Sequence, residues 1–101
     1  MVTCSIRYKV DRKKLDDFEK YAKMWIALIA RFGGQHHGYF LPSEGKSDEA
    51  LCLFSFSSLT AYEQYRQQAA TDPEAQAAVK FGEEKGVLLE WDRTFYRPVL
   101  G

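Results

Sequence analysis

Residues 2–10 alternate between apolar and polar side chains. A side-chain period of two is typical of a β-strand with one face in a hydrophobic core. The stretch therefore predicts a strand with one apolar face in the core and one polar face outside it. The expected apolar side is Val2, Cys4, Ile6, Tyr8 and Val10, and the expected polar side is Thr3, Ser5, Arg7 and Lys9.

A helical period replaces this alternation over residues 13–32. Apolar side chains there recur at steps of three and four, as in an amphipathic helix. They are Leu15, Phe18, Ala22, Trp25, Ile26 and Ile29. Asp11 can cap the start of this helix, and the Gly33-Gly34 pair can end it because glycine accepts the left-handed conformation.

Two strands are expected next. Residues 35–42 (QHHGYFLP) form the first, and residues 49–56 (EALCLFSF) form a nearly continuous apolar run. Such a run is typical of a central strand with both faces covered. The polar residues 43–48 between them predict a turn, so the two strands should form an antiparallel hairpin.

Helical signals return after residue 56. Ser57 or Ser58 can cap a helix, and Thr60 with Glu63 forms an alternative capping box. Its expected apolar face is Leu59, Tyr62, Tyr65 and Ala69. The Asp72-Pro73 pair then restarts a helix, with Asp72 as its cap and Pro73 at the first helical position. This helix runs to about residue 85, before a last strand over residues 87–97.

This order of elements predicts an α+β fold. Strand, helix, strand, strand, helix pair and strand is the βαββαβ arrangement of the ferredoxin-like fold, with an antiparallel sheet and helices on one face. A chain of 101 residues accommodates one such domain, so we assign residues 1–101 to a single domain. The first and third strands should be central.

Composition excludes several classes of partner. Fourteen basic side chains balance fourteen acidic ones, so no global field attracts nucleic acid or anionic membranes. The longest apolar run, residues 24–30, is far shorter than the roughly twenty residues of a membrane span. No signal-peptide pattern precedes the first strand, and the two cysteines lie far apart. We therefore expect a cytoplasmic protein with no nucleic-acid partner and no membrane insertion.

The sheet face without helices predicts the assembly. It should carry Arg7 from the first strand, leucines from the third and the acids Glu90 and Asp92 from the last. A small domain rarely leaves such a face bare, so a second copy is expected to cover it, giving a homodimer through sheet faces. Its polar residues could enclose a cavity. Alternatively, Arg7 simply pairs with Glu90 or Asp92 across neighbouring strands.

Several long motifs resemble the NIPSNAP family, a branch of the dimeric α+β barrel superfamily. They are CSIRYKV (4–10), the helix with Phe18, Tyr21 and Trp25, RFGGQHHGYFLP (31–42), LFSFSSLTAYEQYR (53–66) and YRPV (96–99). The resemblance implies a ferredoxin-like protomer and a dimer with a central pocket. The wider superfamily includes cofactor-independent monooxygenases and haem-degrading enzymes, a kinship that does not establish activity.

The adjacent histidines do not predict a metal site. Neighbouring strand residues point to opposite faces, so His36 and His37 cannot easily bind one ion, and the chain has no third histidine. His37 could instead move a proton in the sheet cavity, or it could bond backbone at a strand edge. No nucleotide, dinucleotide or nucleophilic-serine motif is present, and we expect no cofactor.

Five residues are therefore candidate ligand-binding groups: Arg7, His37, Tyr39, Glu90 and Asp92. Tyr39 is expected on the same side of its strand as His37. Arg7 and Tyr39 could bind a carboxylate or enolate oxygen while His37, the weak catalytic candidate, acts as acid or base. The alternatives are that Tyr39 packs in the core and that the acids only discourage edge aggregation.

These features support two main functional hypotheses. In the first, a homodimer binds a small, partly apolar molecule in a cavity on the sheet face. In the second, the chain is a structural or interaction module without catalysis. A third, a cofactor-independent monooxygenase-like enzyme, rests on the superfamily resemblance alone.

Overall fold

The strand expected over residues 2–10 lies inside the sheet. In the computed structural model, which describes residues 1–45 and 48–100, β1 spans Val2–Val10. The elements that follow are a 3-10 turn (Arg12–Lys14), α1 (Leu15–Arg31), β2 (Gln35–Phe40), β3 (Glu49–Phe56), α2 (Leu59–Thr71), α3 (Pro73–Lys85) and β4 (Leu88–Tyr96). Every expected element is present, with boundaries that differ by at most two residues. Residues 46 and 47 of the expected 43–48 turn lie outside the described residues.

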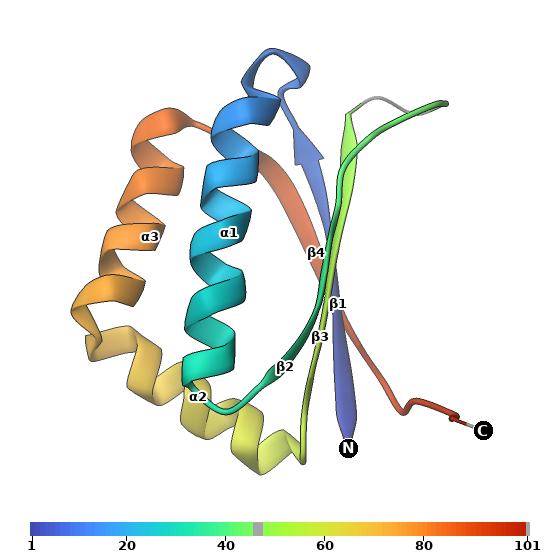
Figure 1. The fold of residues 1–101 in the computed structure, drawn as a ribbon, viewed down its shortest axis with the longest axis vertical. Coiled ribbons are helices and arrows are strands. Elements are labelled where there is room, and N and C mark those ends of the chain that lie inside the picture. Colours follow the sequence, from blue (N-terminus) through green and yellow to red (C-terminus); the bar gives the residue numbers. More distant parts are fainter. Residues whose placement is uncertain (46–47, 101) are drawn as a thin grey trace.

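The four strands form one antiparallel sheet in the order β2-β3-β1-β4. β1 and β3 are central, as predicted, and the three helices lie on one side of the sheet (Figure 1). The fold is therefore α+β and ferredoxin-like. The sheet does not close on itself, because β2 and β4 remain as free edges within the chain.

A bulge interrupts β2. His36 pairs with Phe54 and Gly38 pairs with the preceding residue Leu53, so His37 is the extra residue on this strand. Gly38 has a φ of 112°, a conformation that favours glycine. The bulge places Tyr39 on the same side as His36, with ring centroids 5.1 Å apart. The expectation that Tyr39 shares the side of His37 is wrong, because one extra residue reverses the faces beyond it.

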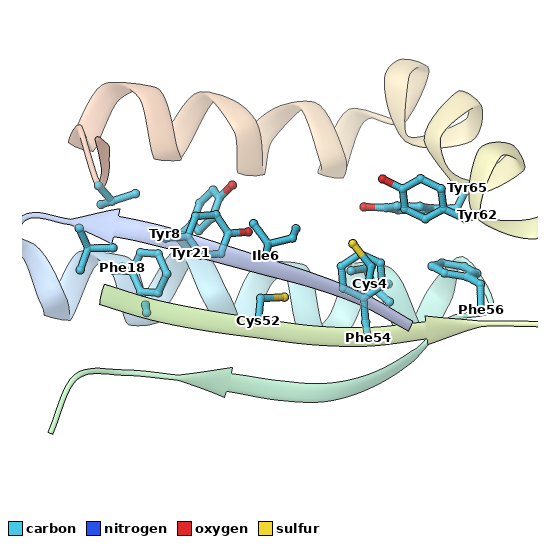
Figure 2. Close-up of a cluster of buried hydrophobic side chains, with 14 residues drawn as sticks. Cys4, Ile6, Tyr8, Phe18, Tyr21, Cys52, Phe54, Phe56, Tyr62 and Tyr65 are labelled. Carbon is cyan, nitrogen blue, oxygen red and sulfur yellow. The ribbon is translucent and has the colours of Figure 1, made fainter. Parts of the chain in front are cut away.

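The core lies between the sheet and the helices (Figure 2). β1 and β3 contribute alternate residues to it, and Phe18 of α1 is completely buried. Two residues assigned to apolar helix faces, Ile26 and Leu59, are instead 37% and 54% exposed. On α1 the buried stripe includes Leu28 because α3 packs there through Ala75 and Ala78. No helix in the described ranges is long and apolar enough to cross a membrane.

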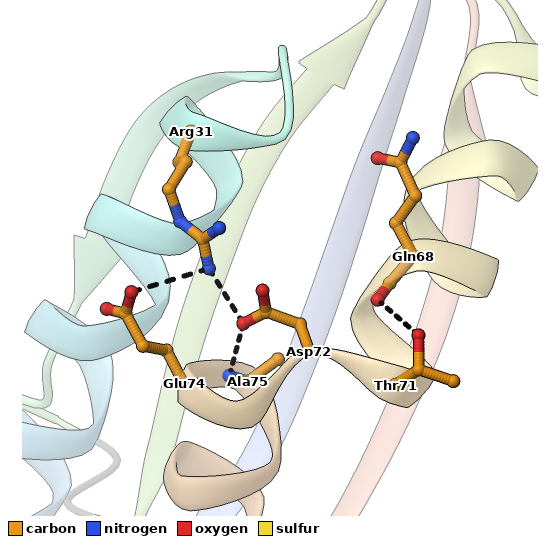
Figure 3. A network of polar contacts seen from close by, with 6 residues as sticks. All are labelled: Arg31, Gln68, Thr71, Asp72, Glu74 and Ala75. Atoms are coloured by element: carbon orange, nitrogen blue, oxygen red, sulfur yellow. Dashed lines mark hydrogen bonds and ion pairs between the residues drawn. The ribbon is translucent and has the colours of Figure 1, made fainter.

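A polar contact fixes the start of α3 against the end of α1 (Figure 3). One carboxylate oxygen of Asp72 accepts hydrogen bonds from the Ala75 backbone N–H at 2.9 Å and from Arg31 at 2.7 Å. The second Arg31 contact is with Glu74, at 3.8 Å. The Arg31 hydrogen bond and the cap bond keep the pKa of Asp72 low. Asp72 therefore caps α3, as predicted, and holds this end of the helix layer in place.

Candidate functional site

A cavity of about 430 Å³ lies between the helices and the sheet. Its volume is within the range of small-molecule sites. Two of its lining residues, Val79 on α3 and Trp91 on β4, are 45% and 59% exposed, so the cavity opens between these two elements. The aromatic lining residues are Tyr8, Tyr21, Trp25, Tyr39, Phe54, Tyr62, Tyr65 and Trp91.

The aromatic lining comes from every layer around the cavity. β1 supplies Tyr8, and α1 supplies Tyr21 (Figure 2). At the other end of the cluster α2 supplies Tyr62 and Tyr65, whose ring centroids lie 5.8 Å apart (Figure 2). Indole and phenol rings combine large apolar surfaces with single polar atoms, so this lining suits a partly apolar molecule.

One polar atom of the lining is poorly satisfied. The Trp25 indole N–H is buried and makes no well-formed hydrogen bond within the described residues, although it lies close enough to the Tyr21 hydroxyl to oppose the rise in the pKa of that phenol. An unsatisfied buried donor costs about 1–3 kcal/mol, so such groups in folded proteins usually have a purpose. A ligand oxygen in the cavity would give this N–H a better-placed acceptor than the Tyr21 hydroxyl.

Four of the lining phenols stay protonated near neutral pH. Burial raises the pKa of Tyr8, Tyr21, Tyr39 and Tyr65 above the ordinary tyrosine range. Each phenol therefore offers a ligand one O–H donor and a lone-pair acceptor, but no negative charge.

His36 and Cys52 form a neutral pair behind the cavity wall. Burial lowers the pKa of His36 to about 4, and burial raises the pKa of Cys52 to about 12. The Gly38 backbone N–H donates to His36 Nδ1 at 2.9 Å, so the ring proton must be on Nε2, which lies 3.5 Å from the Cys52 sulfur. The imidazole therefore donates toward the thiol and cannot deprotonate it, which makes this pair structural.

Two arginines bring charge to the cavity. Arg66 on α2 donates to the Tyr62 hydroxyl at 3.1 Å. Arg93 on β4 pairs with Ile6 and shares its helix-facing side. Glu83 on α3 is the remaining charged lining residue.

The uncovered sheet face holds most of the sequence candidates. Arg7, Glu90 and Asp92 surround a second depression of about 380 Å³, together with Lys9 and Asp48 among others. Arg7 lies directly opposite Asp92 in the β1–β4 ladder. Neither Glu90 nor Asp92 approaches Arg7 within ion-pair distance in the described part of the chain.

His37 lies elsewhere on this face. Its Nε2 is 2.8 Å from the Ser55 hydroxyl, which is 2.7 Å from the Thr3 hydroxyl. Tyr39 is on the opposite side of the sheet, in the larger cavity. The structure therefore groups Arg7 with the two acids and separates both His37 and Tyr39 from them. Among residues 1–45 and 48–100, no three His, Cys, Asp or Glu side chains are arranged as metal ligands.

Sequence reasoning missed Arg66 and Arg93 as site residues. Arg93 did carry a signal, because it falls between Trp91 and Phe95 on a strand side that is otherwise apolar. Arg66 carried none, since an arginine one position beyond the apolar stripe of a helix is ordinary. The sequence pattern placed Tyr8, Tyr62 and Tyr65 on apolar faces and made Tyr39 a ligand-binding candidate. Their shared place in the lining depends on the space left between α3 and β4.

Known proteins with this fold differ in what has been described for them. A NIPSNAP family protein of unknown function from Agrobacterium tumefaciens superposes with a TM-score of 0.83 at 18% identity, covering 97% of this chain and 87% of that one. A cofactor-independent oxygenase from Streptomyces nogalater gives 0.69 at 14% identity, covering 99% and 94%.

A protein from Bacteroides fragilis, described as dimeric, of unknown function and with a ferredoxin-like fold, gives a TM-score of 0.68 at 19% identity, covering 94% of this chain and 93% of that one. At these identities the likeness shows the fold alone. No curated protein sequence matches this chain. The NIPSNAP family model, however, matches residues 5–100. The chain thus belongs to the NIPSNAP family.

Proposed function

We propose that this single-domain protein is a homodimer in which each protomer binds a small, partly apolar molecule between its helices and its sheet. The observation that carries the proposal is the cavity of about 430 Å³ with eight aromatic lining residues. A buried Trp25 N–H without a well-formed hydrogen bond within the described residues adds support. Of the five sequence candidates, Tyr39 lines this cavity. We therefore place the main ligand site on the helix side of the sheet, and not on the uncovered face where the sequence analysis expected it.

The other four candidates receive a different role in this proposal. They would contact the second copy, or polar groups enclosed between the two copies. These four residues are Arg7, His37, Glu90 and Asp92. Support comes from Leu51 and Leu53, which are only partly covered, and from the exposed Phe40 beside them on the same face. A mixture of polar and apolar side chains is typical of a protein–protein interface that retains bound water. The dimer described for the Bacteroides fragilis protein agrees with it.

The cytoplasm is the compartment we propose. Cys4 and Cys52 are both buried and both unpaired. Free thiols are typical of a reducing environment.

Native mass spectrometry of protein purified without added ligand tests the binding proposal. We expect a dimer mass with a reproducible small adduct. Val79→Trp, which places an indole at the cavity mouth, should lose the adduct and keep the dimer. A dimer without adduct in the wild type would contradict ligand binding and favour an interaction module.

A charge on the uncovered face tests the dimer. Leu53 pairs with Ser5 on one side and Gly38 on the other, so it lies in the middle of that face. Leu53→Asp should convert the dimer to monomer in light scattering, since a buried unpaired carboxylate is costly. Gln67→Asp on exposed α2 is the matched control and should stay dimeric. A monomeric wild type would contradict the proposal.

A cofactor-independent oxygenase is the second candidate. The fold likeness to such an enzyme and the phenol-lined cavity favour it. Oxygen uptake with 1,4-dihydroxynaphthalene, in metal-chelated and flavin-free buffer, should exceed the rate without protein. Equal rates with and without protein, across a series of phenols and quinols, would reject this candidate.

A further inference from the structure

Arg66 and Arg93 line the cavity without a carboxylate partner. Neither joins an ion pair anywhere in the described part of the chain. The contrast is with Arg31, which contacts both Asp72 and Glu74 on the outer surface. Both side chains are exposed at the edge of the cavity, so each keeps its charge in contact with water and is free to pair with an anionic group that enters the cavity.

The two guanidinium groups act on the same end of the cavity. Arg66 bonds the Tyr62 hydroxyl, and the Tyr62 ring lies 4.9 Å from Phe95, two residues after Arg93 on the same side of β4. Burial raises the pKa values of Cys4 and Tyr65, and the charges of both arginines oppose that rise at both residues. One ligand group at this end would therefore feel both cations.

The rest of the lining favours a planar, apolar body. Phenol and indole rings surround the space, and the sole acid among the lining residues is Glu83 on α3. Guanidinium groups present paired N–H donors that match the two oxygens of a carboxylate. The neutral phenols can add donors to the same oxygens but cannot replace the charge.

We propose that the cavity takes an aromatic acid, a planar ring system with a carboxylate or phenolate oxygen held by Arg93 and Arg66. The inference rests on the proposed function, because it names the ligand class of that same cavity. The ring system packs among Tyr8, Tyr21 and Trp25, and the acidic group lies toward α2 and β4.

Paired probes of equal shape test the charge preference. Isothermal titration calorimetry is run with 1-naphthoate and with the neutral 1-naphthalenemethanol. We expect naphthoate to bind at least about tenfold more tightly to the wild type. Arg93→Gln and Arg66→Gln should each reduce this ratio several-fold, and the double variant should abolish it while naphthalenemethanol still binds. Glutamine keeps a donor for the Tyr62 hydroxyl, so the loss reports charge.

Two controls make the outcome decisive. Arg12→Gln, on the turn before α1, should keep the full ratio. In the wild type, the affinity ratio should decrease when the NaCl concentration is raised from 50 to 500 mM, because salt screens the charge interaction. This measurement does not depend on the folding of any variant. Equal binding of both probes, or a ratio unchanged in the double variant, would overturn the inference and leave the binding function intact. Binding of neither probe would also overturn the inference, whereas the binding function itself is overturned only by a wild-type dimer without adduct in native mass spectrometry.

Discussion

The helix side and the uncovered side of the sheet are built from the same strands but meet different surroundings. Tyr8 and Phe54 point to the helices and are buried, whereas their neighbours Arg7 and Leu53 point away and are exposed or half-buried. The helix side completes its own core within one chain and still leaves a cavity. The uncovered side has apolar residues that no other element in the described part of the chain covers, and the second copy proposed above would supply that cover.

The adjacent histidines show the same difference at the scale of single residues. His36 lies among Tyr39, Phe54 and Cys52, where burial keeps its imidazole neutral. His37 bonds Ser55 on the open side and is itself exposed. A buried ring of this kind serves packing, while the exposed ring is available to whatever covers the face.

The same substitution on the two sides should give the largest difference. Phe18 is fully buried, so Phe18→Ala should lower the free energy of unfolding by about 3–5 kcal/mol through lost burial and a new void. Phe40 is 51% exposed on the other side, and Phe40→Ala should cost about 1 kcal/mol or less in the monomer. Urea unfolding of both variants measures the two losses.

Protein concentration sharpens this comparison. If a second copy covers the open side, the loss from Phe40→Ala grows with concentration, because dimerisation adds to apparent stability. The loss from Phe18→Ala changes little, since its contacts are inside one chain. A Phe40→Ala loss that is independent of concentration over a hundredfold range would argue against a partner on this side.

The sequence predicted the two sides of β1 and not those of β2, and the reason is geometric. Alternation in β1 is uninterrupted, so its faces follow from the period alone. In β2 the bulge at His37 is a local backbone event, and Gly38 is the one residue that hints at it. The cavity is a different case: Arg93 carried a local signal on its apolar strand side, but the space between α3 and β4 that brings it together with Arg66 is not encoded in any local pattern.

The histidines allow a second test, through pH. His36 has a pKa of about 4 in the folded protein and about 6.5 when unfolded, so below pH 6.5 the unfolded chain binds more protons. Stability is therefore lost as the pH falls from about 6.5 to about 4, by about 1–2 kcal/mol for this half-buried ring. The measurement is urea unfolding of wild type and His36→Phe at pH 7.5 and 4.5.

His36→Phe keeps a ring against Tyr39 but cannot take up a proton. The stability that His36→Phe loses between pH 7.5 and pH 4.5 should therefore be smaller than the wild-type loss by about 1–2 kcal/mol. His37→Phe is the matched control and should retain most of the His36 contribution, because burial is the larger cause of the lowered His36 pKa and the His37 charge the smaller one. Identical pH dependence in the wild type and His36→Phe would show that the helix side does not hold this imidazole neutral.

The smallest predicted effect concerns how tightly the helix side is packed beside its cavity. Gly82 faces Tyr21, and a Cβ there would lie 2.7 Å from Tyr21 Cε1. Alanine favours a helix over glycine by about 1 kcal/mol, whereas overpacking costs about 1–3 kcal/mol. Gly82→Ala should therefore destabilise the folded protein by about 1 kcal/mol in urea unfolding.

In a Tyr21→Leu background the same change should stabilise the folded protein, because the ring edge is gone and the higher helix propensity of alanine remains. Stabilisation by Gly82→Ala in both backgrounds would mean that Tyr21 moves into the cavity at little cost, and the cavity would then adapt its shape rather than present a fixed one.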